Sequence, residues 1–382
     1  MPPRYSSSLR GRLYWAILGL QTTFILVFLF CFHHNYTVDV NSLDLYPVFQ
    51  DVNVIVILGF GFLFGFLRKF GFSGVAFNFL IAALGIQWAI IVDTLLFKDT
   101  TPAIGLTSIY TGLMDVIPVL ISSGIILGKV NPLQLIMMTA IEVPMFSINR
   151  YIMLNQLKME KQVSMMHANM FGAYFGLAVS WLITPPSVNN KFNKEKEKTE
   201  TISELFSVLG TLFMWLFWPS YNALWITSNT ERRNAIYNTY FALAASTVTV
   251  FSITTLLNPW AKLQMNLIRN AVLAGGVSIG FTAYMLQHPW IAMTLGLLAG
   301  LISTLSHRYL QGPLNTVSFV HDTCGVHYTF GLSGLLGGIA YALLILTADY
   351  STIGIIGFQA VVGVGCICLT LALSLTSGLM TG

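Results

Sequence analysis

Long apolar stretches that recur along the whole chain restrict its fold more than any other feature. Each is close to the ~20 residues that an α-helix needs to cross the hydrocarbon core of a bilayer. The polar gaps between them are short, and the final stretch exceeds one span, so it is expected to be tilted, broken or continued past the membrane. The predicted helices are Leu13–Phe32, Val52–Leu67, Gly74–Phe97, Leu106–Gly128, Leu133–Met153, Gln162–Ile183, Leu205–Ile226, Asn234–Leu257, Leu263–Leu286, Trp290–Leu305, Val326–Leu346 and Thr352–Gly382.

The scarcity of charge supports the same interpretation. Only 9% of the 382 residues are charged and 55% are hydrophobic, whereas soluble domains carry about 25% charged residues. So few charges cannot solvate the surface of a globule this large, and most of that surface must face lipid. Composition therefore excludes a disordered chain, a nucleic-acid-binding protein and an ordinary cytosolic enzyme. It predicts an all-α, polytopic membrane protein of about twelve transmembrane helices.

The distribution of basic residues predicts the orientation. The first stretch is too long for a signal-peptide core and reads as an uncleaved span. With twelve spans both termini lie on one side. The loops assigned to that side hold twelve Lys and Arg, including Lys191, Lys194, Lys196 and Lys198 of the segment 184–204. The opposite loops hold six: Lys98, Arg150, Lys158, Lys161, Arg232 and Arg233. The positive-inside rule places both termini, and the loop 184–204, in the cytoplasm.

Few local motifs indicate bound groups or covalent chemistry. The four cysteines have no zinc-binding spacing and no paired extracellular position, so neither a metal nor a disulfide is expected. No nucleophile–base pair is visible, and we expect no cofactor and no enzymatic activity. Asn35-Tyr36-Thr37 is an N-glycosylation sequon in the first loop predicted to face outside.

Ionisable residues inside the predicted spans are expensive, at roughly 2.5–3.5 kcal/mol each near the bilayer centre on insertion scales. Two of them, Asp51 and Asp322, lie near predicted helix starts, where a carboxylate caps free amides. Recurrent glycine spacing in the later helices indicates close helix packing. These rules alone indicate a transporter or channel without locating its pathway. The ionisable residues inside or at the ends of the predicted spans are Asp51, Asp93, Asp115, Glu142, His167, Arg269, Asp322 and His327.

Several ordered strings resemble the Rhesus (Rh) glycoproteins of the ammonium transporter superfamily. The resemblance covers nearly the whole chain as one domain, 1–382. The chain stops at Gly382, where that family begins its cytoplasmic tail, so the tail is expected to be absent. The strings are Phe49-Gln50-Asp51-Val52, Gly59-Phe60-Gly61-Phe62-Leu63, Ala82-Ala83-Leu84-Gly85-x-Gln87-Trp88, Leu127-Gly128-Lys129, Phe171-Gly172-Ala173-Tyr174-Phe175-Gly176-Leu177, Phe217-Trp218-Pro219-Ser220-Tyr221-Asn222, Asn270-Ala271-Val272-Leu273-Ala274-Gly275-Gly276 and His321-Asp322-Thr323-Cys324-Gly325-Val326-His327.

The resemblance implies a twelve-helix fold with an internal inverted repeat, assembled as a trimer with one pore per subunit. In conducting members of the family each pore has an acidic outer vestibule, a gate of two stacked Phe rings and two central histidines. An apolar lumen admits neutral ammonia more easily than a cation. The histidine pair can relay the released proton, because imidazole titrates near neutrality.

Counted from the matching strings, most of these functional positions are altered. The two pore-histidine positions fall at Asn169 and Phe330, and the gate positions fall at Met114 and Tyr221. Only the outer carboxylate has a near match, Glu160.

Two nearby histidines offer alternative assignments. His167 would fit the first central position if its helix carried a one-residue slip or bulge. His327 is one helical turn from Phe330, within the Asp322–His327 string, and there it is expected to support the entry to its helix.

The altered positions predict the function. Asn169 does not titrate and Phe330 has no hydrogen-bonding group, so they cannot relay a proton. This pattern resembles the blood-group Rh polypeptides, although the Asp322–His327 string and the sequon look more like the glycoprotein branch. We therefore expect weak or lost ammonium transport by a plasma-membrane subunit, in a homotrimer or in a heterotrimer with a conducting Rh glycoprotein. The alternatives are a functional channel for ammonia or another small neutral gas, and an unrelated secondary transporter.

Overall fold

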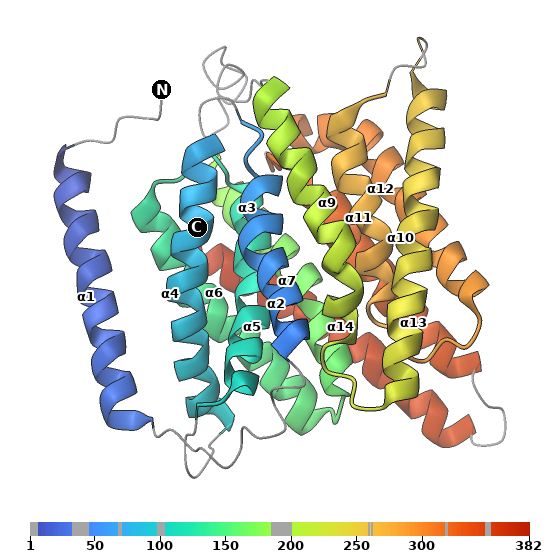
Figure 1. The fold of residues 1–382 in the computed structure, drawn as a ribbon, viewed down its shortest axis with the longest axis horizontal. Coiled ribbons are helices and arrows are strands. Elements are labelled where there is room, and N and C mark those ends of the chain that lie inside the picture. Colours follow the sequence, from blue (N-terminus) through green and yellow to red (C-terminus); the bar gives the residue numbers. More distant parts are fainter. Residues whose placement is uncertain are drawn as a thin grey trace.

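The computed structural model is a bundle of membrane-length helices (Figure 1). It describes residues 7–32, 46–67, 71–97, 104–184, 201–258, 260, 263–317, 320–347 and 353–382. The α-helices are α1 (Ser7–Cys31), α2 (Tyr46–Val54), α3 (Phe60–Leu63), α4 (Gly71–Phe97), α5 (Leu106–Ile125), α6 (Pro132–Tyr151), α7 (Lys161–Ile183), α9 (Thr201–Ala223), α10 (Asn229–Leu257), α11 (Met265–Ile279), α12 (Pro289–Val317), α13 (Leu332–Thr347) and α14 (Ile353–Thr381). Three π-helical turns join or extend them: η2 (Ile55–Gly59), η3 (Ile152–Gln156) and η4 (His327–Gly331).

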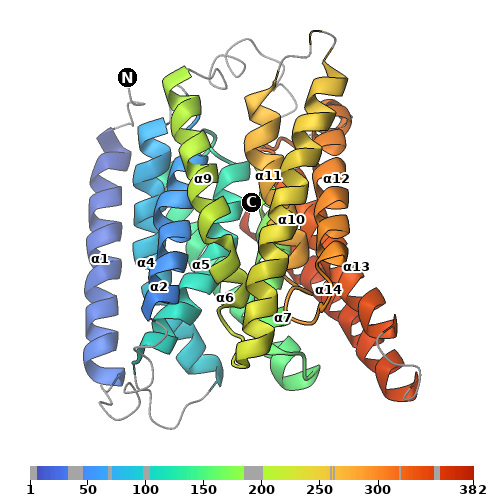
Figure 2. The ribbon, with the colours of Figure 1, turned by 45° about the vertical axis from the view of Figure 1, so that its right-hand side comes forward.

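Every predicted stretch contains a helix, so the all-α, twelve-segment prediction is confirmed. Several boundaries differ from the predicted ones; helix α2, for example, begins at Tyr46 rather than at Val52. Helix α11 ends at Ile279 and is followed by turns rather than continuing to Leu286. Helix α9 begins at Thr201, so the end of segment 184–204 is helical, while 185–200 lies outside the described residues. Helix α14 is one unbroken helix of 29 residues and runs obliquely to its neighbours in Figure 2.

Nine helical stretches of the described residues are long and apolar enough to cross a membrane. Helices α6 and α7 are not among them, and α11 has only 15 residues. The reason is visible in α6, where Glu142, Asn149 and Arg150 are all buried within the bundle. A helix surrounded by other helices can carry such groups, because protein rather than lipid is their solvent.

The core of the bundle surrounds α5, and α1 lies at its edge. In the most apolar 18-residue window of each helix, 83% of the α5 residues are buried but only 6% of the α1 residues. Figures 1 and 2 both show α1 standing at one side of the bundle. The side chains that can line a central route therefore come from the inner helices.

Glycine allows the later helices to approach closely. A Cβ added at Gly275 of α11 would lie 2.4 Å from the carbonyl oxygen of Ala242 in α10. A Cβ at Gly296 of α12 would lie 2.2 Å from the same oxygen. Only residues without a side chain fit at such distances, so these two glycines hold α10 against both neighbours.

Candidate functional site at the centre of the bundle

The four positions assigned to the gate and to the central histidines all lie inside the bundle. Met114 comes from α5, Asn169 from α7, Tyr221 from α9 and Phe330 from η4. Each is at most 1% exposed. The structure therefore places side chains from four separate elements in one buried core.

Two of these elements, α9 and η4, bring aromatic rings into contact with a ring of α3, and we call Phe60, Phe330, Trp218 and Tyr221 the aromatic column. The ring centroids of Phe330 and Phe60 are 5.9 Å apart and the rings are stacked. Phe330 lies 6.4 Å from Trp218, and Trp218 lies 5.2 Å from Tyr221. These distances are those of packed aromatic pairs, so the space around Phe330 is filled by rings.

Asn169 extends the aromatic column through hydrogen bonds. Its amide nitrogen donates to the Tyr221 hydroxyl at 3.5 Å and to the Met166 carbonyl at 3.4 Å. Its amide oxygen is buried without a partner among the described residues. Asn169 thus meets a phenol, which does not titrate near neutral pH, where a proton relay would need a second imidazole.

His167 faces a different side of α7 from Asn169. Its Nδ1 lies 2.9 Å from the Val163 carbonyl, so this nitrogen carries the proton and donates. Its ring meets Phe281 edge-on at 5.0 Å. Helix α7 is a regular α-helix from Lys161 to Ile183, without the slip or bulge that the alternative assignment of His167 requires. Two residues along such a helix differ by about 200° in direction.

His327 lies at the entry to η4. Its backbone N–H donates to Asp322 Oδ2 at 2.7 Å, and Asp322 Oδ1 accepts from the amides of Cys324 and Gly325. The His327 ring packs edge-on against Tyr174, with centroids 5.8 Å apart. Asp322 thus caps a helix entry as predicted, and His327 belongs to that entry rather than to the aromatic column.

The same expectation is wrong for Asp51. Helix α2 begins at Tyr46, so Asp51 lies in its second turn and not at its start. Its carboxylate accepts a hydrogen bond of 2.6 Å from Ser220 of α9. The carboxylate therefore joins two helices instead of capping one.

Glu160 precedes α7 at an exposed position. Its carboxylate accepts a hydrogen bond of 2.6 Å from the Tyr284 hydroxyl, in the turns that follow α11. The next residue, Lys161, places its ammonium 3.4 Å from the ring centroid of Trp225. An acidic and an aromatic group thus lie at this end of the bundle, but a lysine of the chain already covers the aromatic face.

A buried ion cluster lies beside this end and was not predicted. The topology count places Arg150 among the loop charges although the predicted helix Leu133–Met153 contains it; it lies in the last turn of α6 and is 1% exposed. Its guanidinium donates to Asp93 of α4 and, at 2.9 Å, to Asp115 of α5. The count of basic residues on this side therefore includes one that is buried among the helices.

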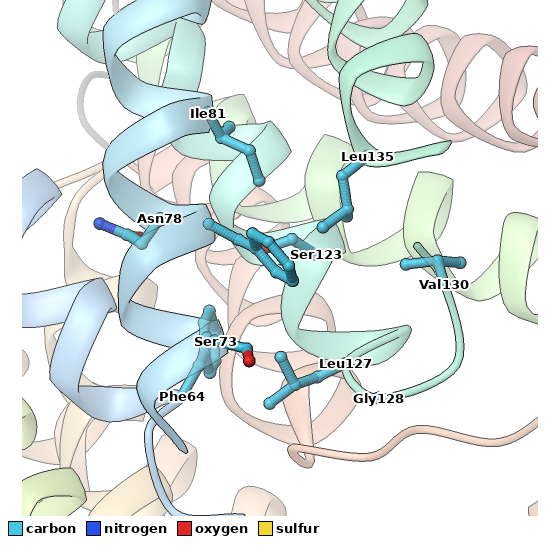
Figure 3. Close-up of a pocket in the computed structure, with 11 residues that line it drawn as sticks. Phe64, Ser73, Asn78, Ile81, Ser123, Leu127, Gly128, Val130 and Leu135 are labelled. Atoms are coloured by element: carbon cyan, nitrogen blue, oxygen red, sulfur yellow. The ribbon is translucent and has the colours of Figure 1, made fainter. Parts of the chain in front are cut away.

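A small cavity between α4 and α5 is separate from the four assigned positions. It has a volume of about 20 Å³, roughly one water molecule, and Phe64, Ser73, Ser123 and Leu135 are among its walls (Figure 3). Figure 3 shows the Asn78 amide directed away from Ser123 and Leu135. That amide donates to the Val56 carbonyl of η2 at 3.0 Å, so it supports the π-helical turn rather than a ligand.

Asn35, the predicted glycosylation position, lies outside the described residues. Among the described residues, no group of three or more His, Cys, Asp or Glu side chains has the arrangement of a metal site.

Comparisons with known proteins agree over the whole chain. The model of the Ammonium Transporter Family matches residues 16–382. RH-like protein IC of Gorilla gorilla gorilla is 41% identical over 387 aligned residues, which cover 100% of this chain and 92% of the relative. The human Blood group Rh(D) polypeptide is 39% identical with the same coverage.

Solved structures show the same fold. Rh50 of Nitrosomonas europaea superposes with a TM-score of 0.75 at 28% identity, covering 88% of this chain and 86% of that one. Mep2 of Saccharomyces cerevisiae superposes with a TM-score of 0.70 at 16% identity, covering 88% and 82%, a likeness of fold alone.

Proposed function

The chain belongs to the Ammonium Transporter Family as an Rh-like, multi-pass membrane protein, and from this premise we propose that its own centre does not conduct ammonium. It acts instead as a subunit of an Rh membrane complex. The family consists of transporters, and we propose no enzymatic activity for this member.

The aromatic column is the observation that carries this proposal. Phe330 stands where the resemblance puts a central histidine, and its ring is held between Phe60 and Trp218. A phenyl ring at this point fills the space that a hydrated or bare ammonia molecule would need. Because Phe330 is 1% exposed, packing rather than solvent surrounds it.

The missing proton relay supports the same proposal. Asn169 and Tyr221 are joined by a hydrogen bond, and neither changes its charge near neutral pH. His167 packs on Phe281, away from this pair. A proton taken from ammonium at the outer end would therefore have no titrating acceptor at Asn169 or Phe330.

We further propose the setting in which the chain works. It lies in the plasma membrane as one unit of residues 1–382, with both termini and the segment 184–204 in the cytoplasm. It assembles as a homotrimer, or as a heterotrimer with a conducting Rh glycoprotein. The basic loop residues support this orientation.

Uptake of radiolabelled methylammonium by cells that express only this chain tests the proposal. We expect uptake equal to that of cells carrying the empty vector. The double change Asn169→His and Phe330→His should raise uptake, because it restores both titrating groups and removes the phenyl ring. Uptake by the unchanged chain well above the vector level, abolished by Phe330→Trp, would instead establish the alternative of a functional channel.

A matched pair of variants separates opening of the column from general loosening. Phe330→Ala removes a ring from the aromatic column, and Phe146→Ala removes an equally buried ring that packs on Phe171. Each change costs about 3–5 kcal/mol of stability. Only Phe330→Ala should alter permeation; equal effects of both variants would mean that the column is not the barrier.

A further inference from the structure

The ammonium of Lys161 lies on an aromatic ring although two other effects oppose that position. Lys161 is the first residue of α7, where the partial positive charge of a helix N-terminus disfavours a cation. The residue is exposed, so water is open to its ammonium. The ammonium lies instead 3.4 Å from the centroid of the Trp225 ring. The indole face is therefore a place where an ammonium group binds through a cation–π contact.

The position of the Trp225 ring is fixed by its neighbours. Its backbone N–H donates to the side-chain oxygen of Gln162 at 3.3 Å, and the Gln162 amide nitrogen donates to the Asn222 carbonyl at 2.6 Å. The ring also meets the buried Tyr110 ring, with centroids 6.2 Å apart and planes at 71°. Because Gln162 follows Lys161 in α7, one helix positions both the ring and its ammonium.

A cavity adjoins this contact. Its volume is about 390 Å³, within the range of small-ligand pockets. Lys161 is part of its wall, and the other charged side chains there are Asp93 and Arg150. Arg150 is shared by Asp93 and Asp115, so its positive charge is compensated. Shortening Lys161 would therefore leave space for a small ion beside the ring, next to a wall without an uncompensated cation.

We propose that the face of Trp225 is a binding site for a primary alkylammonium ion, and that Lys161 fills this site as a tethered ligand. The head of a lysine side chain is itself a primary alkylammonium, chemically equivalent to methylammonium. The contact is autoinhibitory, because a free ion must compete with a group whose attachment to the same chain gives it a high effective concentration. This site goes beyond the proposed function and contains no residue of the aromatic column.

The opposite interpretation is that the contact only packs the end of the bundle. Lys161 would then contribute to stability alone, and no free cation would take its place when its side chain is shortened. The two interpretations predict different binding by the same variant.

Equilibrium binding of 14C-labelled methylammonium to the purified full-length protein in phosphatidylcholine nanodiscs, at constant sodium chloride, tests the proposal. Lys161→Ala should show saturable binding with an affinity at least about tenfold above that of the unchanged chain, because the tethered competitor is gone. Lys158→Ala is the matched control, since Lys158 is exposed in the same connection and does not line the cavity. Its binding should equal that of the unchanged chain.

A second change identifies the ring as the binding surface. In the Lys161→Ala background, Trp225→Leu should weaken binding by about tenfold, the fold-change that a cation–π contact supports. Trp215→Leu removes another half-buried indole, which packs on Tyr240, and should leave binding unchanged. Equal binding by the unchanged chain and Lys161→Ala, no saturable binding by folded Lys161→Ala, or full binding after Trp225→Leu would overturn the proposal.

Labelling of the lysine itself gives an independent measurement that does not require Lys161→Ala to fold. Acetylation of Lys161 by N-acetoxysuccinimide, read by mass spectrometry, should become at least about twofold faster in Trp225→Leu, because the ammonium loses its contact. The rate at Lys158 should stay the same. An unchanged rate at Lys161 would contradict the proposal. Binding and labelling are both measured without transport, so neither result depends on whether the aromatic column conducts.

Discussion

Replacing Gly296 by alanine tests the close contact between α10 and α12. The added Cβ would lie 2.2 Å from the carbonyl oxygen of Ala242 and 2.8 Å from its Cα. Ordinary carbon–oxygen contacts begin at about 3.3 Å. The two helices must therefore separate by about 1 Å at this point, because the nearest neighbours are backbone atoms of Ala242 that cannot swing aside.

The expected cost follows from this displacement. Overpacking a tight helix contact typically destabilises a protein by about 1–3 kcal/mol. The same Ala242 carbonyl also lies close to Gly275 of α11, so moving α10 disturbs a second interface. We expect a loss toward the upper end of this range.

The free energy of unfolding is measured by titrating detergent-solubilised protein with sodium dodecyl sulfate and following tryptophan fluorescence. Gly365→Ala in α14 is the control, because a Cβ there meets nothing within 4 Å. Alanine in a helix interior is favoured over glycine by up to about 1 kcal/mol, so the control should be neutral or slightly stabilised. Equal stability of the two variants would refute the argument from close packing.

Three further changes test other parts of the structure. Arg150→Ala should cost about 3–5 kcal/mol, because it leaves Asp115 buried without its cation, whereas the exposed Arg233→Ala should change stability by less than about 0.5 kcal/mol in the same titration. Asp322→Ala should cost about 1–3 kcal/mol through three unpaired backbone amides, and Asp322→Asn less; equal losses would contradict the capping role. Burial raises the pKa of the Cys324 thiol, so maleimide at pH 7.5, read by mass spectrometry, should modify Cys324 only after unfolding, and rapid modification of the folded protein would contradict its burial.

The helices were predictable because each buries or exposes about twenty apolar residues in one run. The residue at which a helix ends was harder to predict. The predicted span Leu263–Leu286 is apolar to its end, but α11 stops at Ile279, and the turns that follow bring Tyr284 to Glu160. Hydropathy measures transfer to lipid and does not report which tertiary partner a residue has.

The buried ion cluster shows that the sequence does not predict which charged residues pair. The sequence marks Asp93 and Asp115 as costly residues inside spans, but Arg150, at the end of the predicted helix Leu133–Met153, is counted with the loop charges. Its partners are 57 and 35 residues away in the chain, so no local spacing pairs them. A mid-span carboxylate implies a cation somewhere, and searching the polar helix ends for it would have found Arg150.

The central positions are assigned by counting from motifs, and counting does not predict their contacts. Asn169, Phe330 and Tyr221 were placed by counting from motifs, and the structure buries all three together. Trp218 lies one turn before Tyr221 on α9 and completes the contact with Phe330. The spacing of three residues between two aromatic side chains was visible in the sequence, but only the fold shows which helix they meet.

The π-helical turns make the ring packing at the centre of this protein depend on the number of residues in each turn. Turn η2 ends immediately before Phe60, and turn η4 contains Phe330. A π turn holds one residue more than an α turn, and one residue rotates everything beyond it by about 100° around the helix axis. Deleting a single residue in either turn would thus rotate the rest of the helix about its axis more than it would shorten the helix. Two chains with the same side chains could then differ at their centres, because register alone decides whether the two rings meet.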